Sequence, residues 1–251
     1  MKKLVAFLLV MTTLLLGASA ALAEDKDAGW KVDAAAAYNS KYIWRGIMQV
    51  DDPVLQPSLN LNKGGFTFNV WGSYDLTDKN GHKNNFTEID LTAEYAFSVG
   101  DFSFPVGVIN YQFPNTAFNS TTEIYAGASY SWLITPTFKL YQDIDESHGQ
   151  YANLALAYTL DLPAPAADVT WGLALGLAGG WGSKDNNKYY WGVDEDMLTD
   201  TMATIGLPVK IKDFITITPA YSHVWLMDSK VKDVAGYDDK GFFGVTLSVS
   251  F

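Results

Sequence analysis

The feature that most constrains this chain is an alternation of apolar with small or polar side chains that has a period of two residues. Near the C-terminus, apolar Phe243, Val245 and Leu247 alternate with glycine, threonine and serine. The same pattern recurs in three further segments, at residues 89–97, 124–132 and 154–160. Because successive side chains of a strand point to opposite faces, this period predicts β-strands with one apolar face. Helical periodicity is absent after residue 23, so we predict an all-β protein.

The first 23 residues have the pattern of a cleaved signal peptide. Lys2 and Lys3 precede an apolar run at residues 4–16, and Ala21 and Ala23 supply the small residues that a signal peptidase recognises. An apolar run of about 13 residues is too short to cross a bilayer comfortably, and no later segment predicts a transmembrane helix. We therefore expect an exported chain whose mature part, residues 24–251, forms one domain.

The composition excludes several classes of protein. The 251 residues include 28 acidic and 17 basic side chains, a formal net charge of −11, and no cysteine. Without cysteine, a disulfide scaffold, a thiolate metal site and a cysteine nucleophile are all excluded. A nucleic-acid partner is not expected, because such proteins carry a basic patch and this chain is acidic throughout. An aromatic content of 14% is too high for a disordered protein.

Twelve strands are predicted, at residues 30–42, 54–61, 66–75, 86–97, 102–112, 121–132, 137–143, 150–160, 168–181, 199–208, 214–225 and 241–251. Their connections alternate between short turns and long loops, which is typical of transmembrane barrels. In lipid every backbone group of a strand must be paired, and only closure removes the free edges. We therefore predict a closed antiparallel transmembrane β-barrel of about twelve strands in the outer membrane of a Gram-negative bacterium, with both termini in the periplasm. A periplasmic β-sandwich is the alternative that the alternation leaves open.

The chain stops on an aromatic residue, Phe251, which completes the apolar row of the last strand. A C-terminal aromatic of this kind resembles the targeting strand of bacterial outer-membrane barrels. We expect Phe251 to be an assembly signal, with the barrel-assembly machinery as a partner during insertion. Outer-membrane lipids are the other expected partner.

Charged side chains occur on the strand phase that should face the lumen. Six are acidic and three are basic: Asp33, Glu88, Asp90, Glu94, Glu123, Asp143, Lys31, Lys41 and Lys139. Arg45, the only arginine, shares this phase. Because a guanidinium is planar and carries five donors, we predict that Arg45 turns inward and forms a bidentate pair with Glu88, Asp90 or Glu123. The alternative is an Arg45 at the rim that caps its own loop.

The acidic lumen favours a narrow passive channel for small solutes or cations. The alternative is a barrel with a filled lumen that acts as a structural or surface-interaction protein. A lipid-modifying outer-membrane enzyme is a third hypothesis, but the segment around His148 lacks the asparagine-bearing motif of such enzymes, His223 lies near a predicted aromatic girdle, and His82 lies in a polar loop. We therefore expect no enzymatic activity, no cofactor and no metal site.

One segment near the N-terminus carries a family pattern. Ser40, Tyr42, Arg45 and Gly46 form a Ser-x-Tyr-x-x-Arg-Gly element, which is followed by an acidic loop and a Pro-x-x-Gln strand whose members are Pro53 and Gln56. This pattern resembles the opening strands of the uncharacterised bacterial outer-membrane family Gcw_chp. The resemblance is specific over about thirty residues, whereas the rest of the chain shares only barrel character. It implies an outer-membrane location and a presumed pore, and it names no substrate.

Overall fold

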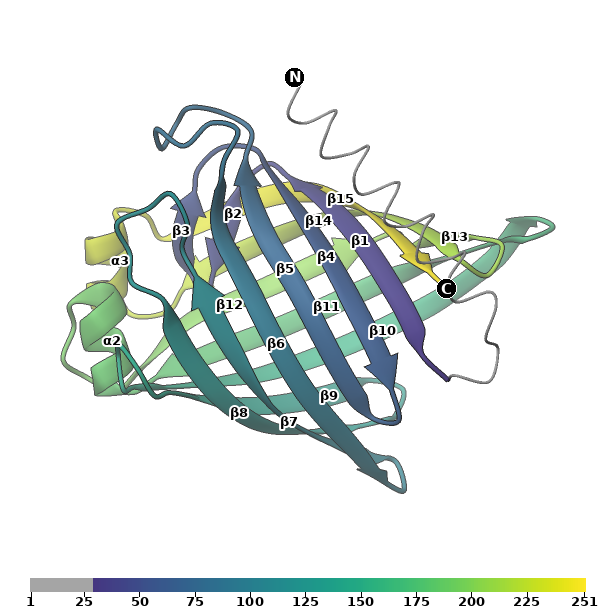
Figure 1. Ribbon diagram of the computed structural model, residues 1–251, viewed down its shortest axis with the longest axis horizontal. Helices are drawn as coiled ribbons and strands as arrows, with labels where there is room; N and C mark the ends of the chain where they lie inside the picture. Colours follow the sequence, from purple (N-terminus) through teal and green to yellow (C-terminus); the bar gives the residue numbers. More distant parts are fainter. Residues whose placement is uncertain (1–28) are drawn as a thin grey trace.

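The computed structural model describes residues 29–251, and most of them belong to one antiparallel barrel (Figure 1). The expected signal peptide, residues 1–23, lies outside the described residues. The barrel strands are β1 (Lys31–Asn39), β4 (Val54–Lys63), β5 (Phe66–Asp75), β6 (Phe86–Val99), β7 (Phe102–Gln112), β8 (Thr121–Tyr130), β9 (Thr135–Asp143), β10 (Gln150–Ala166), β11 (Val169–Gly182), β12 (Met197–Gly206), β14 (Ile215–Leu226) and β15 (Asp239–Ser250).

The barrel is closed by pairing between its first and last strands. Tyr38 of β1 lies opposite Val245 of β15, and Phe251 exchanges two further backbone hydrogen bonds with Val32, of 2.9 and 3.3 Å. The short strand β13 (Val209–Ile211) continues the position of β12, because both pair with β11 and β14. The prediction of a closed antiparallel barrel of twelve strands is therefore confirmed.

The apolar phase of the strands forms the outer surface. Phe68, Val70 and Leu247 are 48%, 49% and 47% exposed. In a water-soluble domain the apolar face of a strand would instead be buried in the core. Residues of the other phase, such as Asn69 and Glu94, point inward and bond to one another or to neighbouring strands. An apolar outer band around a polar interior is the arrangement of a barrel that lies in lipid.

The first long connection departs from the prediction. The first strand was expected to reach residue 42, but β1 ends at Asn39, and residues 42–50 form a separate hairpin of β2 (Tyr42–Trp44) and β3 (Ile47–Val50). Arg45 and Gly46 make its two-residue turn, with φ of 47° and 81°. Two positive φ angles define the tight turn that matches the twist of a hairpin. Arg45 therefore turns inward because it lies at the tip of this inserted hairpin, and not because it continues the phase of β1.

Two short helices correct the expectation that the exported chain contains no helix. α2 (Lys184–Trp191) begins after the N-cap Ser183, α3 (Ser229–Ala235) begins after the N-cap Asp228, and each ends at a left-handed glycine. Both lie at the long-loop end of the barrel (Figure 1). There Trp191 and Val231 pack with other apolar residues into a small core of their own. Within residues 29–251, neither helix has the length and hydropathy of a membrane-crossing helix.

The hairpin of β10 and β11 also differs from the prediction, which ended the first of these strands at residue 160. β10 has 17 residues and β11 has 14, so this hairpin extends past the neighbouring strands at the short-turn end. The indole of Trp171 donates a 2.7 Å hydrogen bond to the carbonyl of Pro163 and ties the extension together. Pro163 and Pro165 lie in this extension, near the tip of the hairpin.

Candidate functional site

The tip of the β2–β3 hairpin forms an ion pair inside the barrel. Arg45 donates from Nη1 and Nη2 to the two carboxylate oxygens of Glu123 on β8, each at 2.7 Å. The side chains are 11% and 2% exposed, and the hydroxyl of Tyr111 donates a third hydrogen bond to Glu123, at 2.9 Å. The predicted bidentate pair is therefore present, and Glu123 is its acidic member.

The guanidinium of Arg45 is also surrounded by aromatic rings. Its central carbon lies 4.2 Å from the ring centre of Tyr151, 4.4 Å from that of Trp44 and 4.6 Å from that of Tyr141. A cation over a ring face is attracted by the ring quadrupole, and a planar guanidinium also stacks on it. The hairpin from one side of the lumen is thus clamped to strands β8, β9 and β10.

The hairpin is fixed at its turn and at its base. A Cβ added to Gly46 would lie 2.9 Å from side-chain atoms of both Asp200 and Leu226, so only glycine fits there. The carbonyl of Gly46 accepts a hydrogen bond from Tyr237, whose pKa burial raises to about 12. At the base, Lys41 pairs with Asp51, and this hydrogen bond lowers the pKa of the Asp51 carboxyl.

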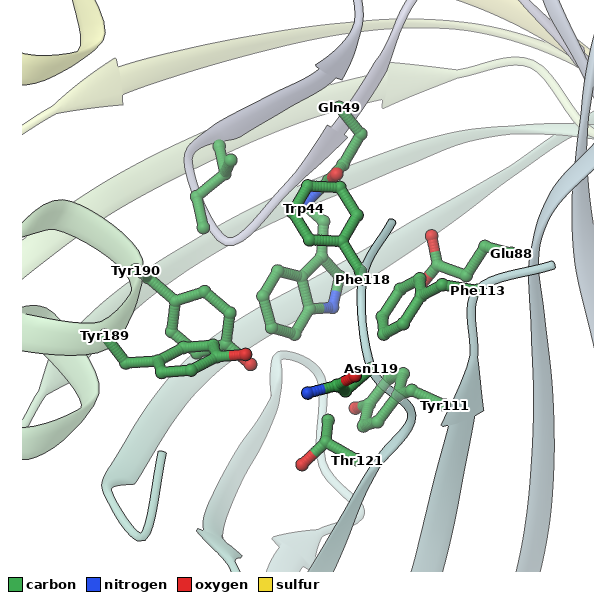
Figure 2. A pocket seen from close by; sticks show the side chains of 11 residues that line it. Trp44, Gln49, Glu88, Tyr111, Phe113, Phe118, Asn119, Thr121, Tyr189 and Tyr190 are labelled. Atoms are coloured by element: carbon green, nitrogen blue, oxygen red, sulfur yellow. The ribbon is translucent and has the colours of Figure 1, made fainter. Parts of the chain in front are cut away.

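Cavities lie on both sides of the clamp. A mouth cavity of about 260 Å³ opens toward the long loops and is bordered by Trp44, Glu88 and Tyr190 (Figure 2). An inner cavity of about 360 Å³ lies on the other side of Arg45 and is bordered by Asp90 and Asp200, among others. The two cavities have only Trp44 and Tyr111 in common among the residues that line them. The hairpin tip therefore forms the partition between them.

Carboxyl groups dominate the charged residues near this partition. Glu88 is 6% exposed and borders the mouth cavity, and Tyr42 hydrogen-bonds to it. Asp90 borders the inner cavity, and its Oδ1 atom is buried without a hydrogen-bond partner. Asp200, on β12, accepts hydrogen bonds from Tyr151 and Thr199.

Two of the expected lumen acids have other surroundings. Glu94 lies farther toward the short-turn end, where it accepts hydrogen bonds from Tyr125 at 2.6 Å and Lys139 at 3.4 Å. Asp143 is only 1% exposed, and its oxygens accept bonds from Thr121 and from the backbone N–H groups of residues 145–147. Asp143 therefore holds the loop that follows β9, and its role as a pore-lining group stays a prediction.

The remaining lumen charges lie away from the clamp. Asp33 accepts a 2.8 Å hydrogen bond from Asn62 on the neighbouring strand. Lys41 lies beyond the end of β1, at the base of the hairpin. Lys31, at the start of β1, is exposed.

A family model described as "Bacterial protein of unknown function (Gcw_chp)" matches residues 23–243, most of the chain. This protein belongs to the Gcw_chp family. A KdgM porin, solved in complex with disordered oligogalacturonate, has 10% identity and a TM-score of 0.52 over 88% of this chain and 99% of its own. An outer membrane channel from Pseudomonas putida F1 has 10% identity and a TM-score of 0.50, over 88% and 95% of the two chains. No curated protein matches the sequence. At this identity the two structures show that the Gcw_chp chain has a porin-like outer-membrane barrel fold.

In this Gcw_chp protein the motif residues build and seat the inserted hairpin. The Ser40 hydroxyl accepts a hydrogen bond from the backbone of β15, and Tyr42 begins β2. Arg45 and Gly46 form the turn, while Pro53 accepts a backbone bond from Leu76 just before β4. Gln56 is buried and hydrogen-bonds Asn39 and Ser73. The residues of the motif thus lie in the hairpin inserted into the barrel and in the strands that hold it.

Sequence reasoning missed the aromatic residues of the Gcw_chp lumen and the acid at its wall, namely Trp44, Tyr111, Tyr141, Tyr151 and Asp200. One signal in the sequence, the glycines at inward positions of the strands, could have indicated these tyrosines. A Cβ on Gly180 would lie 2.1 Å from the hydroxyl of Tyr151, and one on Gly107 would lie 2.6 Å from that of Tyr125. Glycines at these inward positions therefore leave room for the tyrosine side chains of the neighbouring strands.

Proposed function

We propose that this Gcw_chp protein is a narrow passive channel of the outer membrane that favours cations, with the β2–β3 hairpin as its constriction. The observation that carries the proposal is the pair of lumen cavities, one on each side of the Arg45–Glu123 clamp. A barrel whose interior served packing alone would fill these spaces with side chains, as eight-stranded barrels do. Here the partition is a single hairpin tip.

The charge of the constriction supports a preference for cations. Glu88, Asp90 and Asp200 line the two cavities besides the Arg45–Glu123 pair, and Arg45 is the one base among the lining residues within the described chain. Carboxyl groups along a narrow passage raise the local concentration of cations and repel anions. Because Arg45 is neutralised by Glu123, its charge does little to reverse this preference.

The porin-like fold supports a role in passage of small solutes, since the two solved relatives in fold are described as a porin and an outer membrane channel. In the orientation we propose, the long loops with α2 and α3 face the outside of the cell and the short turns face the periplasm. The mouth cavity then opens to the medium, and the inner cavity opens toward the periplasm.

Planar-bilayer recording of the purified protein tests the proposal. We expect small-conductance events and a reversal potential in a KCl gradient that indicates K⁺ preference. Arg45→Ala and Glu123→Ala should each raise the conductance, because each releases the hairpin tip. A wild-type protein and variants that all fail to conduct, or a preference for Cl⁻, would overturn the proposal.

The second candidate is a barrel with a filled lumen that acts through its surface loops. The cover of α2 and α3 over the hairpin favours this function, since Trp191 and Val231 pack against Ile47 and Tyr237. Silence of all variants in the bilayer recording is the result it requires. Against the enzyme hypothesis, the His223 ring lies between Tyr221 and Asp239, at 3.1 and 2.9 Å, on the outer face of the barrel, so its contacts are not those of a Ser–His pair.

A further inference from the structure

The mouth cavity is walled by aromatic rings set at steep angles to one another (Figure 2). Trp44 and Tyr190 meet edge to face at 5.2 Å, and Phe113 and Phe118 do so at 6.0 Å. Rings from the hairpin, from the loop after β7 and from α2 therefore surround one space. The rings of Tyr111 and Tyr189 and the aliphatic side chain of Ile47 also line the cavity.

The cavity has a carboxyl group and no base. Glu88 is the one charged residue among those that border it, and the other polar groups are neutral: the side chains of Gln49, Asn119 and Thr121, the tyrosine hydroxyls and the indole N–H of Trp44. The single guanidinium of the chain, that of Arg45, is held by Glu123 on the far side of Trp44. The cavity therefore presents ring faces and negative potential to a solute that enters from the long-loop end.

We propose that the mouth cavity binds a small organic ammonium ion, with its methylated nitrogen against the aromatic rings and its charge balanced by Glu88. The inference rests on the proposed channel and names the class of solute at its entrance. Aromatic boxes with a nearby carboxylate are suited to quaternary ammonium groups, because these are large, weakly hydrated and apolar at their surface. A volume of about 260 Å³ fits a compact ligand of this kind.

Competing solutes fit the cavity less well. An anion would meet Glu88 with no base to offset the repulsion. A metal ion would find one carboxyl group and would lose most of its water among ring faces. A neutral sugar could stack on the rings, but it would leave Glu88 without a counter-charge. The lumen already holds one cation between aromatic rings and a carboxylate. Arg45 lies among Trp44, Tyr141 and Tyr151 and pairs with the carboxylate of Glu123.

Titration calorimetry of the purified barrel in detergent is the test, with choline as the probe. The matched neutral probe is 3,3-dimethylbutan-1-ol, which has the same shape but carbon in place of the charged nitrogen. We expect choline to bind at least about tenfold more tightly than the alcohol, because only choline gains the ring–cation and carboxylate attractions. Glucose serves as the neutral sugar probe and should show no comparable heat.

Two variants and two matched controls locate the binding. Phe118→Ala should weaken choline binding about two- to fivefold, and Glu88→Gln about tenfold or more. The control for Phe118 is Trp132→Ala, since both residues are 71% exposed but Trp132 lies at the short-turn end. The control for Glu88 is Glu94→Gln, a lumen acid outside the mouth cavity. Neither control should change the affinity for choline.

Several results would overturn this site. They are equal binding of choline and the alcohol, binding of glucose alone, and Glu88→Gln or Phe118→Ala variants that bind choline as the wild type does. Heat-modifiable migration on gels verifies that each variant is folded. Equilibrium binding needs no conduction, so a protein that binds choline but never conducts refutes the channel and keeps the site. A protein that conducts but does not bind choline refutes the site and keeps the channel.

Discussion

Replacing Arg45 by alanine should destabilise the barrel far more than the loss of an ordinary ion pair does. Glu123 is 2% exposed on its side chain, and after the substitution only the Tyr111 hydroxyl remains among its hydrogen-bond donors. Removing one partner of a buried pair leaves an uncompensated charge, which costs about 3–5 kcal/mol. We expect the free energy of unfolding to fall by about that amount.

A conservative replacement and a paired replacement separate the contributions of charge, hydrogen bonding and stacking to the stability of the clamp. Arg45→Lys keeps a positive charge but loses one of two charge-assisted hydrogen bonds and the planar stacking, for a cost of about 1.5–3 kcal/mol. Arg45→Met with Glu123→Leu removes both charges at once. The double variant should be more stable than the sum of the single losses predicts, by about 0.5–3 kcal/mol, because no buried charge is left alone.

Urea unfolding of the barrel refolded into vesicles, followed by tryptophan fluorescence, measures these differences. The control is Lys139→Ala, which removes a pair with Glu94 at 3.4 Å whose side chains are 29% and 23% exposed. Such partly exposed pairs contribute about 0–1 kcal/mol. The reasoning fails if Arg45→Ala costs no more than Lys139→Ala, or if the losses from the two single variants simply add in the double variant.

Three other expectations concern the hairpin, the assembly signal and the orientation. Gly46→Ala should cost about 1–3 kcal/mol in the same urea assay, because its φ is 81° and its Cβ would collide with Asp200 and Leu226; an unchanged midpoint would contradict the turn geometry. Phe251→Ser should reduce the outer-membrane level of the protein on fractionation, and a normal level would argue against a targeting role. A cysteine at Val234, which is 57% exposed on α3, should react with an impermeant maleimide on intact cells, whereas one at Asp101 in a short turn should not. The reverse labelling would invert the orientation.

The barrel was predictable because the same alternation of apolar and polar residues is repeated in strand after strand. Every strand must separate an apolar from a polar face, so the period of two appears in segments as distant as 89–97 and 241–251. Strand ends were less predictable, since β10 continues to Ala166, past the point where its sequence alternation was expected to stop. The helices were readable in part, because Ser183 and Gly192 bracket α2 with the residues that helix caps prefer.

The site was harder to predict because it depends on contacts between opposite walls. The single arginine and the carboxylates of strands β6 and β8 indicated an inward pair. The choice of Glu123 over Glu88 depends on how far the hairpin reaches, which no local pattern records. Arg45 has a left-handed backbone conformation, which is unusual for a residue other than glycine. The Arg45–Gly46 pair is therefore not a typical turn sequence and did not predict the hairpin.

The clamp across the lumen has a consequence for the order of events during insertion. Arg45 and Glu123 are 78 residues apart, and contacts of this separation form after local ones because the loop they close is long. The hairpin cannot reach Glu123 until β8 is in place and the sheet has curved round. We therefore expect each new copy to pass through a stage in which the barrel wall has formed and the Arg45–Glu123 clamp has not. If the proposed channel is right, a freshly inserted copy should therefore conduct more than the mature one until the Arg45–Glu123 pair has formed.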